Sequence, residues 1–279
     1  GWFECSLKEG GSVVLSASLS QEETASLKRR FTSGVKAIGE ISGYRDQLRR
    51  CADSLITDHN GRKKINAGLT WMYTGLLRET LVSLSGLALY GLDSPKMFEE
   101  ILDNLIADQQ ERLFRRTTQV EAPLYMACTL QDYIDYGADE KAVWKKYGVI
   151  MRGIIESYLP GERAEIAMQP NGLLWAQKDG TALTWMNAYA DGKPVTERAG
   201  YQVETNALWY NAICFVLEME EKYGTKKSQF ISKWSAVRDL VKLNYQNTFW
   251  NAARGCLADY VDNDGQNMDI RPNQLCPLA

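Results

Sequence analysis

Apolar and polar residues alternate near the start of the chain. Val13, Leu15, Ala17 and Leu19 fall on one face of this stretch, and serines occupy most of the other face. Alternation with a period of two indicates a half-buried β-strand. Because a strand pair of this length is not stable by itself, the sequence predicts that residues 1–20 are the tail of an N-terminal β domain whose remainder lies outside the chain.

The next stretch is charged, and its apolar residues recur every three or four positions: Leu27, Phe31, Val35, Ile38 and Ile41. This spacing places them on one face of a helix, although two glycines interrupt the pattern. We therefore expect a linker helix within residues 21–50.

Two kinds of helix alternate along the rest of the chain. One kind has a single apolar stripe and a polar face that is exposed to solvent, and it is predicted over residues 94–110, 139–159 and 226–247. The other kind is apolar nearly all round and has to be covered on every side; it is predicted over residues 80–90, 123–136 and 206–219. Ser94 and Asp139 stand where N-caps of the first kind are expected.

This order predicts an all-α fold, an (α/α)6-type toroid whose inner helices line a central pocket. We assign the toroid to residues 51–279. A closed toroid of this kind needs six helix pairs, and the sequence indicates three. We therefore expect the domain to be truncated at its C-terminal end. A generic helical bundle is the alternative.

Residues 160–203 show no sustained helical period and are far longer than an ordinary connection of about 4–6 residues. The stretch is rich in aromatic and polar side chains: Trp175, Trp185, Asn187, Asp191, Glu197, Arg198 and Tyr201. A sugar offers an apolar C–H face to aromatic rings and hydroxyls to planar polar groups. The loop is therefore a candidate carbohydrate site, unless its tryptophans only close the mouth of the toroid.

A second candidate cluster, residues 71–80, includes Trp71 and leads into the first inner helix. Glu79 lies in the expected first helical turn, where the helix dipole alone favours an acid. Arg78 beside it supplies matching hydrogen-bond donors, so the pair is also suited to bracket neighbouring sugar hydroxyls. Both interpretations stay open from the residues alone.

Of the 279 residues, 45% are apolar and 24% charged, which is typical of a globular protein. The net charge is −3 and no basic block occurs, so we expect neither nucleic acid nor a membrane surface as a partner. No apolar run approaches the roughly 18–20 residues that cross a bilayer. The first residues also lack the features of a signal peptide.

Several chemistries are disfavoured by residue type. The single histidine, His59, lies in a turn sequence, so a Ser-His-Asp triad or a two-histidine zinc site is not expected. No glycine-rich phosphate loop occurs. Residues 262–265 (DNDG) resemble half a calcium loop but lack its final glutamate, and we interpret them as a turn. The sequence predicts no metal and no cofactor.

The six cysteines are scattered without paired spacing: Cys5, Cys51, Cys128, Cys214, Cys256 and Cys276. We interpret them as buried free thiols, which fits a reducing, cytoplasmic location. A processed secreted chain is the alternative.

Several strings resemble the amylo-α-1,6-glucosidase domain of bacterial glycogen debranching enzymes. The strings are residues 78–80 (RET), 171–175 (NGLLW), 184–187 (TWMN), 194–198 (PVTER), 203–212 (VETNALWYNA) and 271–274 (RPNQ). The resemblance covers roughly residues 60–279. It implies an (α/α)6 toroid that removes α-1,6-linked glucose at the branch points of glycogen or another branched α-glucan. It also implies an inverting mechanism, in which two carboxylic acids stand about 6.5–9.5 Å apart.

By the same resemblance, Arg78 and Glu79 bind hydroxyls of the terminal glucose, Trp185 packs on its ring, and Arg198 with Glu204 completes the loop wall. The full expected set of substrate-binding residues is Trp71, Arg78, Glu79, Trp175, Trp185, Arg198 and Asn206.

The sequence departs from the family pattern at the position of the general acid, where Asn187 replaces an aspartate. An amide does not supply this proton. Glu204 is the first substitute to consider and Glu197, which replaces a proline, is the second; a weakly active subgroup is another possibility. Glu79 also replaces an aspartate.

The family's second catalytic carboxylate follows the RPNQ string, beyond residue 279. We therefore expect the isolated chain to be inactive. The alternatives are a non-catalytic glycan-binding module and another α/α-toroid glucosidase, of the glucoamylase-like or trehalase-like kind.

Overall fold

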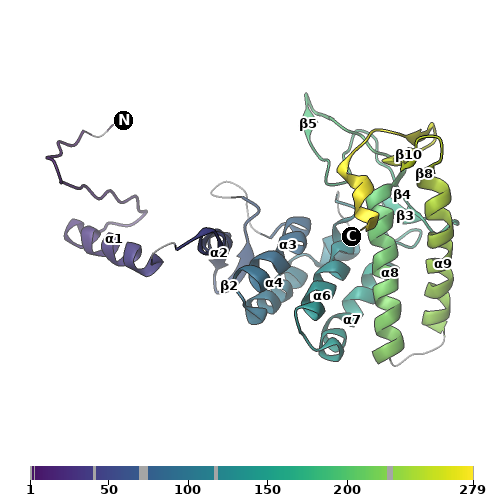
Figure 1. The fold of residues 1–279 in the computed structure, drawn as a ribbon, viewed down its shortest axis with the longest axis horizontal. Coiled ribbons are helices and arrows are strands. Elements are labelled where there is room, and N and C mark those ends of the chain that lie inside the picture. Colours follow the sequence, from purple (N-terminus) through teal and green to yellow (C-terminus); the bar gives the residue numbers. More distant parts are fainter. Residues whose placement is uncertain are drawn as a thin grey trace. The chain divides into compact units, whose positions relative to one another are not determined.

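The computed structural model describes residues 2, 4–39, 42–68, 75–115, 119–224 and 229–278 (Figure 1). The chain divides into two compact units, Gly1–Leu48 and Arg49–Ala279. Each unit is described by itself.

The N-terminal unit contains no strand among its described residues, so the strand expected within residues 1–20 is wrong for this part of the chain. An extended segment needs a neighbour to accept and donate its ladder hydrogen bonds, and this unit offers none among the described residues. Leu15 and Leu19, expected on the buried face, are exposed. That these residues are the tail of a β domain stays a prediction.

Two helices occupy the region where one linker helix was expected: α1 (Thr24–Ile38) and α2 (Tyr44–Ser54). Gly39 ends α1 with a φ of 69° and donates its N–H to the carbonyl oxygen of Lys36. Glycine adopts this conformation without the steric cost that a side chain adds, which is why it commonly follows a helix.

The second unit is mostly helical. Its helical elements are α3 (Leu77–Leu84), the π-helix η1 (Ser85–Gly91), α4 (Pro95–Asp108), α5 (Gln110–Phe114), the 3-10 helix η2 (Ala122–Leu124), α6 (Tyr125–Asp135), α7 (Glu140–Glu156), α8 (Val203–Tyr223), α9 (Gln229–Phe249) and the 3-10 helix η3 (Pro272–Leu278). Its strands are β1 (Ile56–His59), β2 (Arg62–Ile65), β3 (Ile166–Met168), β4 (Leu174–Ala176), β5 (Tyr189–Ala190), β6 (Lys193–Pro194), β7 (Tyr201–Gln202), β8 (Trp250–Asn251), β9 (Cys256–Leu257), β10 (Tyr260–Asp262) and β11 (Gly265–Asn267).

All six helices expected from the hydrophobic pattern are present, with shifted ends. Ser94 caps α4 by accepting the N–H of Met97 at 3.4 Å, and Asp139 caps α7 by accepting the N–H of Ala142 at 2.7 Å. Both N-cap predictions are confirmed. The first inner helix begins three residues earlier than expected, at Leu77, and ends as a π-helix.

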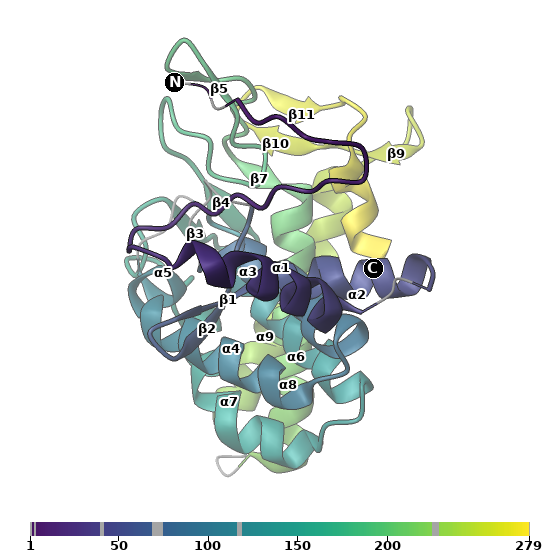
Figure 2. The ribbon, with the colours of Figure 1, turned by 90° about the vertical axis from the view of Figure 1, so that its left-hand side faces the viewer.

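The helices are arranged in the expected order of inner and outer elements. α3 contacts α6, and α6 contacts α8; α4 packs on α3, α7 on α6 and α8, and α9 on α8. Figures 1 and 2 show α6, α8 and α9 side by side, with the C-terminal strands gathered at one end of them. Trp209 of α8 and Trp234 of α9 are fully buried, with ring centroids 5.8 Å apart. Closure of this layered arrangement into a toroid stays a prediction.

The long segment 160–203 is not helical, as expected, but it contains five short strands, β3 to β7. Gly172 fixes its position on the helices. The φ of Gly172 is 83°, and a Cβ atom there would lie 3.0 Å from the Cβ of Leu240 on α9. The carbonyl oxygen of Gly172 accepts the indole N–H of Trp209 at 3.0 Å. The NGLLW string therefore includes a docking point between the loop and α8 and α9.

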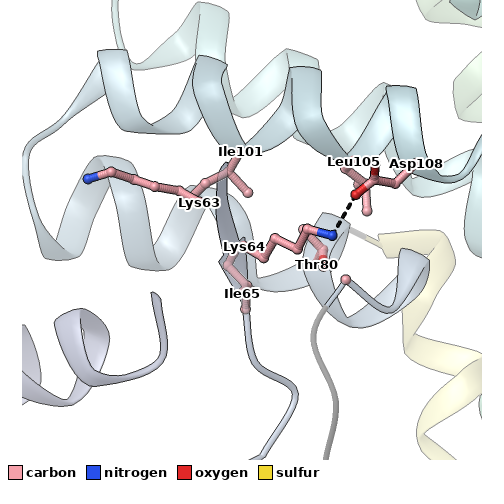
Figure 3. A pocket seen from close by; sticks show the side chains of 8 residues that line it. Lys63, Lys64, Ile65, Thr80, Ile101, Leu105 and Asp108 are labelled. Carbon is pink, nitrogen blue, oxygen red and sulfur yellow. Dashed lines mark ion pairs between the residues drawn. The ribbon is translucent and has the colours of Figure 1, made fainter. Parts of the chain in front are cut away.

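The hairpin of β1 and β2 is pinned to α4 by charged side chains. Asp108 accepts ion pairs from Lys64 at 2.7 Å and from Arg62 at 2.8 Å. Figure 3 shows the first pair beside a small cavity of about 10 Å³, which has room for about one water molecule. The two-residue turn of the hairpin is Asn60-Gly61, with φ of 56° and 76°, so His59 lies at the edge of a turn as predicted.

Two further predictions concern the turn at residues 262–265 and the cysteines. The DNDG sequence joins β10 to β11, which confirms the turn. All six cysteines are free, but Cys5 and Cys51 are exposed and the other four are half-buried. The expectation of buried thiols is therefore wrong for Cys5 and Cys51, and it holds only in part for the other four.

Candidate functional site

A pocket of about 450 Å³ opens on the second unit, within the range of about 300–1,000 Å³ that is usual for small-molecule sites. It is lined by the hairpin region, by α3 and η1, by α6 and by the long loop. The lining residues are Leu55, Ile65, Asn66, Ala67, Arg78, Glu79, Val82, Ser83, Leu87, Tyr125 and Trp185. The pocket thus joins apolar walls with a small number of polar groups.

Arg78 and Glu79 enter the pocket from the first turn of α3. Arg78 is 9% exposed, and its guanidinium donates to Glu79 at 2.8 Å and to the buried Glu121 at 3.0 Å. Burial lowers the pKa of Arg78, but the two carboxylates more than offset this and raise it above its usual value. The pocket wall therefore holds a fixed cation beside a carboxylate that is partly open to solvent.

Trp185 reaches the same pocket from the long loop. Its side chain is exposed, and its indole N–H donates to Asn273 of η3 at 2.7 Å. Asn273 in turn donates to Asp259 at 2.7 Å. The orientation of Trp185 is thereby set by residues that follow it by more than seventy positions.

Behind the loop lies a buried ionic network centred on Arg198. Arg198 donates to both carboxylate oxygens of Glu204, one of them at 2.7 Å, and to Asp259 at 2.9 and 3.0 Å. Arg271 adds a further ion pair to Asp259. Burial lowers the pKa of Arg198, but its hydrogen bonds and ion pairs to Glu204 and Asp259 raise it overall. Removing one partner of such a pair leaves an unpaired buried charge and costs about 3–5 kcal/mol, so the loop and α8 depend on the network being complete.

The expected acids do not line the pocket. Glu204 has no exposed surface, and both of its oxygens accept hydrogen bonds from Arg198. A general acid has to reach the leaving oxygen within hydrogen-bond distance, so the role of Glu204 as the acid stays a prediction that the pocket lining does not support. Asn187 and Glu197 are exposed on the loop, and Glu197 accepts the N–H of Gly180 at 3.1 Å.

Other residues expected to bind substrate support the loop instead. Asn206 is fully buried; its side chain accepts the N–H of Leu174 at 2.7 Å and donates to the carbonyl oxygens of Leu174 and Gln202. The rings of Trp175 and Tyr201 pack edge to face, with centroids 4.8 Å apart. Trp175, Arg198 and Asn206 are not among the residues that line the pocket. Trp71 lies outside the described residues.

The structure adds site residues that the sequence did not single out. Asn66 and Tyr125 line the pocket, Glu121 holds Arg78, and Asp259 anchors both Arg198 and Asn273. Asn273 lies in the RPNQ string, so its motif was noticed but its contact with Trp185 was not. The acid directly before an Ala-Pro helix start was the one sequence signal available for Glu121.

Metal-binding clusters and membrane-spanning helices are both absent from the described residues. No group of three or more His, Cys, Asp or Glu side chains in this part of the chain is arranged to hold a metal ion. Likewise, none of the described helices combines the length and apolar character needed to traverse a bilayer.

The second unit is therefore a mostly helical structure with a polar and aromatic pocket that is a candidate small-molecule site. Residues 48–279 match the family described as amylo-alpha-1,6-glucosidase. The chain therefore belongs to this family, which is one of glycoside hydrolases of the debranching and glucosidase kind. No curated protein matches the chain.

Proposed function

We propose that the pocket binds the terminal glucose of an α-1,6-linked branch in glycogen or another branched α-glucan, within an inverting α-1,6-glucosidase of (α/α)6 toroid type. The observation that carries this proposal is the meeting of Arg78, Glu79 and Trp185 in one pocket. Family membership supports the substrate class.

The three side chains suit a hexose for physical reasons. The indole of Trp185 offers an apolar face to the C–H groups of the ring. Arg78 supplies N–H donors, and the carboxylate of Glu79 is partly open to solvent, so the pair has both a donor and an acceptor for neighbouring hydroxyls. Asn66 adds an amide on the hairpin side.

Hydrolysis needs a second acid group. Inverting glycosidases use two carboxylic acids, one as acid and one as base. Among the described lining residues Glu79 is the only carboxylate. We therefore propose that these residues supply sugar binding, and that residues 1–279 by themselves release little or no glucose.

A non-catalytic glycan-binding module is the second candidate. Asn187 at the position of the family acid favours it, together with the single carboxylate in the pocket. The six free cysteines support the proposal of a reducing, cytoplasmic location for either candidate.

The test compares ligands and products. We expect isomaltose, which carries an α-1,6 bond, to bind more tightly in calorimetric titrations than maltose or trehalose. Glucose release from limit dextrin should stay near background. Equal or weaker binding of isomaltose would reject the α-1,6 assignment, and preferred binding of maltose or trehalose would instead indicate another toroid glucosidase.

A second measurement separates the enzyme from the binding module. The test uses a longer chain that also carries the second carboxylic acid. There, Asn187→Asp should raise glucose release from limit dextrin if the loop belongs to a catalytic site. If that variant binds isomaltose as its parent does and still releases nothing, the binding module is the better description.

A further inference from the structure

Glu121 is a buried carboxyl group that sits behind the pocket wall. It immediately precedes η2, has no exposed surface, and is absent from the lining of the pocket. One of its oxygens accepts the N–H of Arg78 at 3.0 Å, while the other has no hydrogen-bond partner among the described residues. A ligand in the pocket therefore meets Glu121 only through Arg78.

Arg78 is shared between two carboxylates. Its Nη1 donates to Glu121 and its Nη2 donates to Glu79 at 2.8 Å. Glu121 thus ties the guanidinium to the core from one side, while Glu79 stands on the pocket side. Only the ionised form of Glu121 adds Coulombic attraction to its hydrogen bond with the Arg78 cation, so the hold on Arg78 depends on the charge of Glu121.

We infer that Glu121 is a positioning residue that fixes the Arg78 guanidinium in the pocket wall, and that its charge sets how firmly Arg78 and Glu79 are presented to a ligand. The second half of this inference rests on the proposed function; the first half does not.

The groups that act on Glu121 come from four elements. They are Arg78 on α3, Tyr125 on α6, Tyr158 after α7 and Glu204 on α8. Burial raises the pKa of Glu121 to about 7, with the charge of Arg78 opposing this and that of Glu204 adding to it. Burial also raises the pKa of both tyrosines, which stay neutral in this range.

The sign of the effect follows from this pKa. Below about pH 7 Glu121 is protonated and holds Arg78 weakly; above it Glu121 is ionised and holds Arg78 firmly. Affinity for a sugar in the pocket is therefore expected to rise with pH, by about threefold to tenfold between pH 5.5 and 8.0.

The first experiment needs no ligand. The guanidinium 15N resonances of Arg78 are assigned by their loss in Arg78→Lys and followed from pH 5.5 to 8.0. In the wild type they should shift with a midpoint near 7, and in Glu121→Gln, which keeps the shape and cannot ionise, they should stay constant. Constant resonances in the wild type, or an unchanged midpoint in the variant, would overturn the inference.

The second experiment measures isomaltose binding by calorimetry over the same pH range. The Glu121→Gln variant should bind at every pH as weakly as the wild type does at pH 5.5. A variant with wild-type affinity and an unchanged pH profile would contradict the inference. If Glu121→Gln does not fold, the wild-type resonances and the wild-type profile still decide.

Two control variants exclude other causes. His59→Gln removes the one histidine of the chain and should leave the pH profile unchanged. Glu220→Gln changes another buried carboxylate that is paired with an arginine, Arg152. Glu220 does not line the pocket and lies sixteen residues beyond Glu204 on α8, about 24 Å along the helix. Its substitution should therefore change the stability of the protein but not its affinity for isomaltose.

The outcomes also separate the inference from the proposed function. A shift of the Arg78 resonances without isomaltose binding at any pH would leave the positioning role standing and reject the α-1,6-glucoside as the ligand. Isomaltose binding without any pH-dependent shift of the Arg78 resonances would support the proposed ligand and reject the positioning role of Glu121.

Discussion

Trp185 gives the pocket an apolar surface, and the Arg78–Glu79 pair gives it a polar one. Trp185 is 41% exposed although its edge is hydrogen-bonded to Asn273. An aromatic side chain that is fixed at its edge and open on its surface loses little conformational entropy when a ligand packs on it. At the residue scale, Trp185 is therefore the side chain whose removal should affect binding most directly.

Trp185→Ala is expected to weaken isomaltose binding by about tenfold, because the C–H contacts with the ring are lost. Calorimetric titration measures this. The matched control is Trp250→Ala, which removes a similarly exposed tryptophan, 45% exposed, that does not line the pocket. Equal losses in the two variants would contradict the assignment of Trp185 to the site.

Sequence reasoning reached some of these residues and missed others for a physical reason. Arg78, Glu79 and Trp185 lie in strings that resemble the amylo-α-1,6-glucosidase family, so each could be named before its surroundings were known. Asn66 and Tyr125 reach the pocket because the hairpin packs on α4 and α6 packs on α3. No periodicity in the sequence encodes that juxtaposition.

At the scale of elements, the position of the long loop depends on its contact with α8 and α9 near Gly172. Gly172→Ala adds a methyl group where the backbone has a positive φ and where Leu240 stands 3.0 Å away. We expect a loss of about 2 kcal/mol or more in the free energy of unfolding, measured by chemical denaturation.

The control for this substitution is Gly180→Ala in the same loop. Gly180 has a φ of 63° but nothing within 4 Å of the added atom, so only the backbone term of about 1 kcal/mol is expected. If both variants lose the same stability, close packing at Gly172 does not contribute.

Helices were the elements that the sequence predicted best, because an apolar stripe with a period near 3.6 and a capping residue act over a few neighbouring positions. The expected strand within residues 1–20 failed because pairing depends on a partner segment, which alternation alone does not supply. The π-helix at Ser85–Gly91 had no local signal either.

At the scale of the whole molecule, the family match and the pocket both belong to the second unit. The family match begins at residue 48, next to the boundary between the units at Leu48 and Arg49. Deleting residues 1–42, which leaves α2 intact, should therefore preserve both the pocket and the packed helical layers.

For this deletion we expect the midpoint of thermal unfolding to change by no more than about 2 °C, equivalent to less than about 1 kcal/mol for a protein of this size. Differential scanning calorimetry of both proteins measures it. A large drop in the midpoint, or loss of isomaltose binding, would mean that the N-terminal unit supports the rest of the chain.

The bond between Trp185 and Asn273 has a consequence for recognition. An indole has a single donor and no acceptor, and here that donor is already occupied. Trp185 has no polar group left to distinguish one hydroxyl configuration from another; it responds only to how flat and how hydrocarbon-like the opposing surface is. If the pocket binds a sugar as proposed, discrimination between epimers comes from its polar lining groups, Arg78 and Glu79 on α3 and the amide of Asn66.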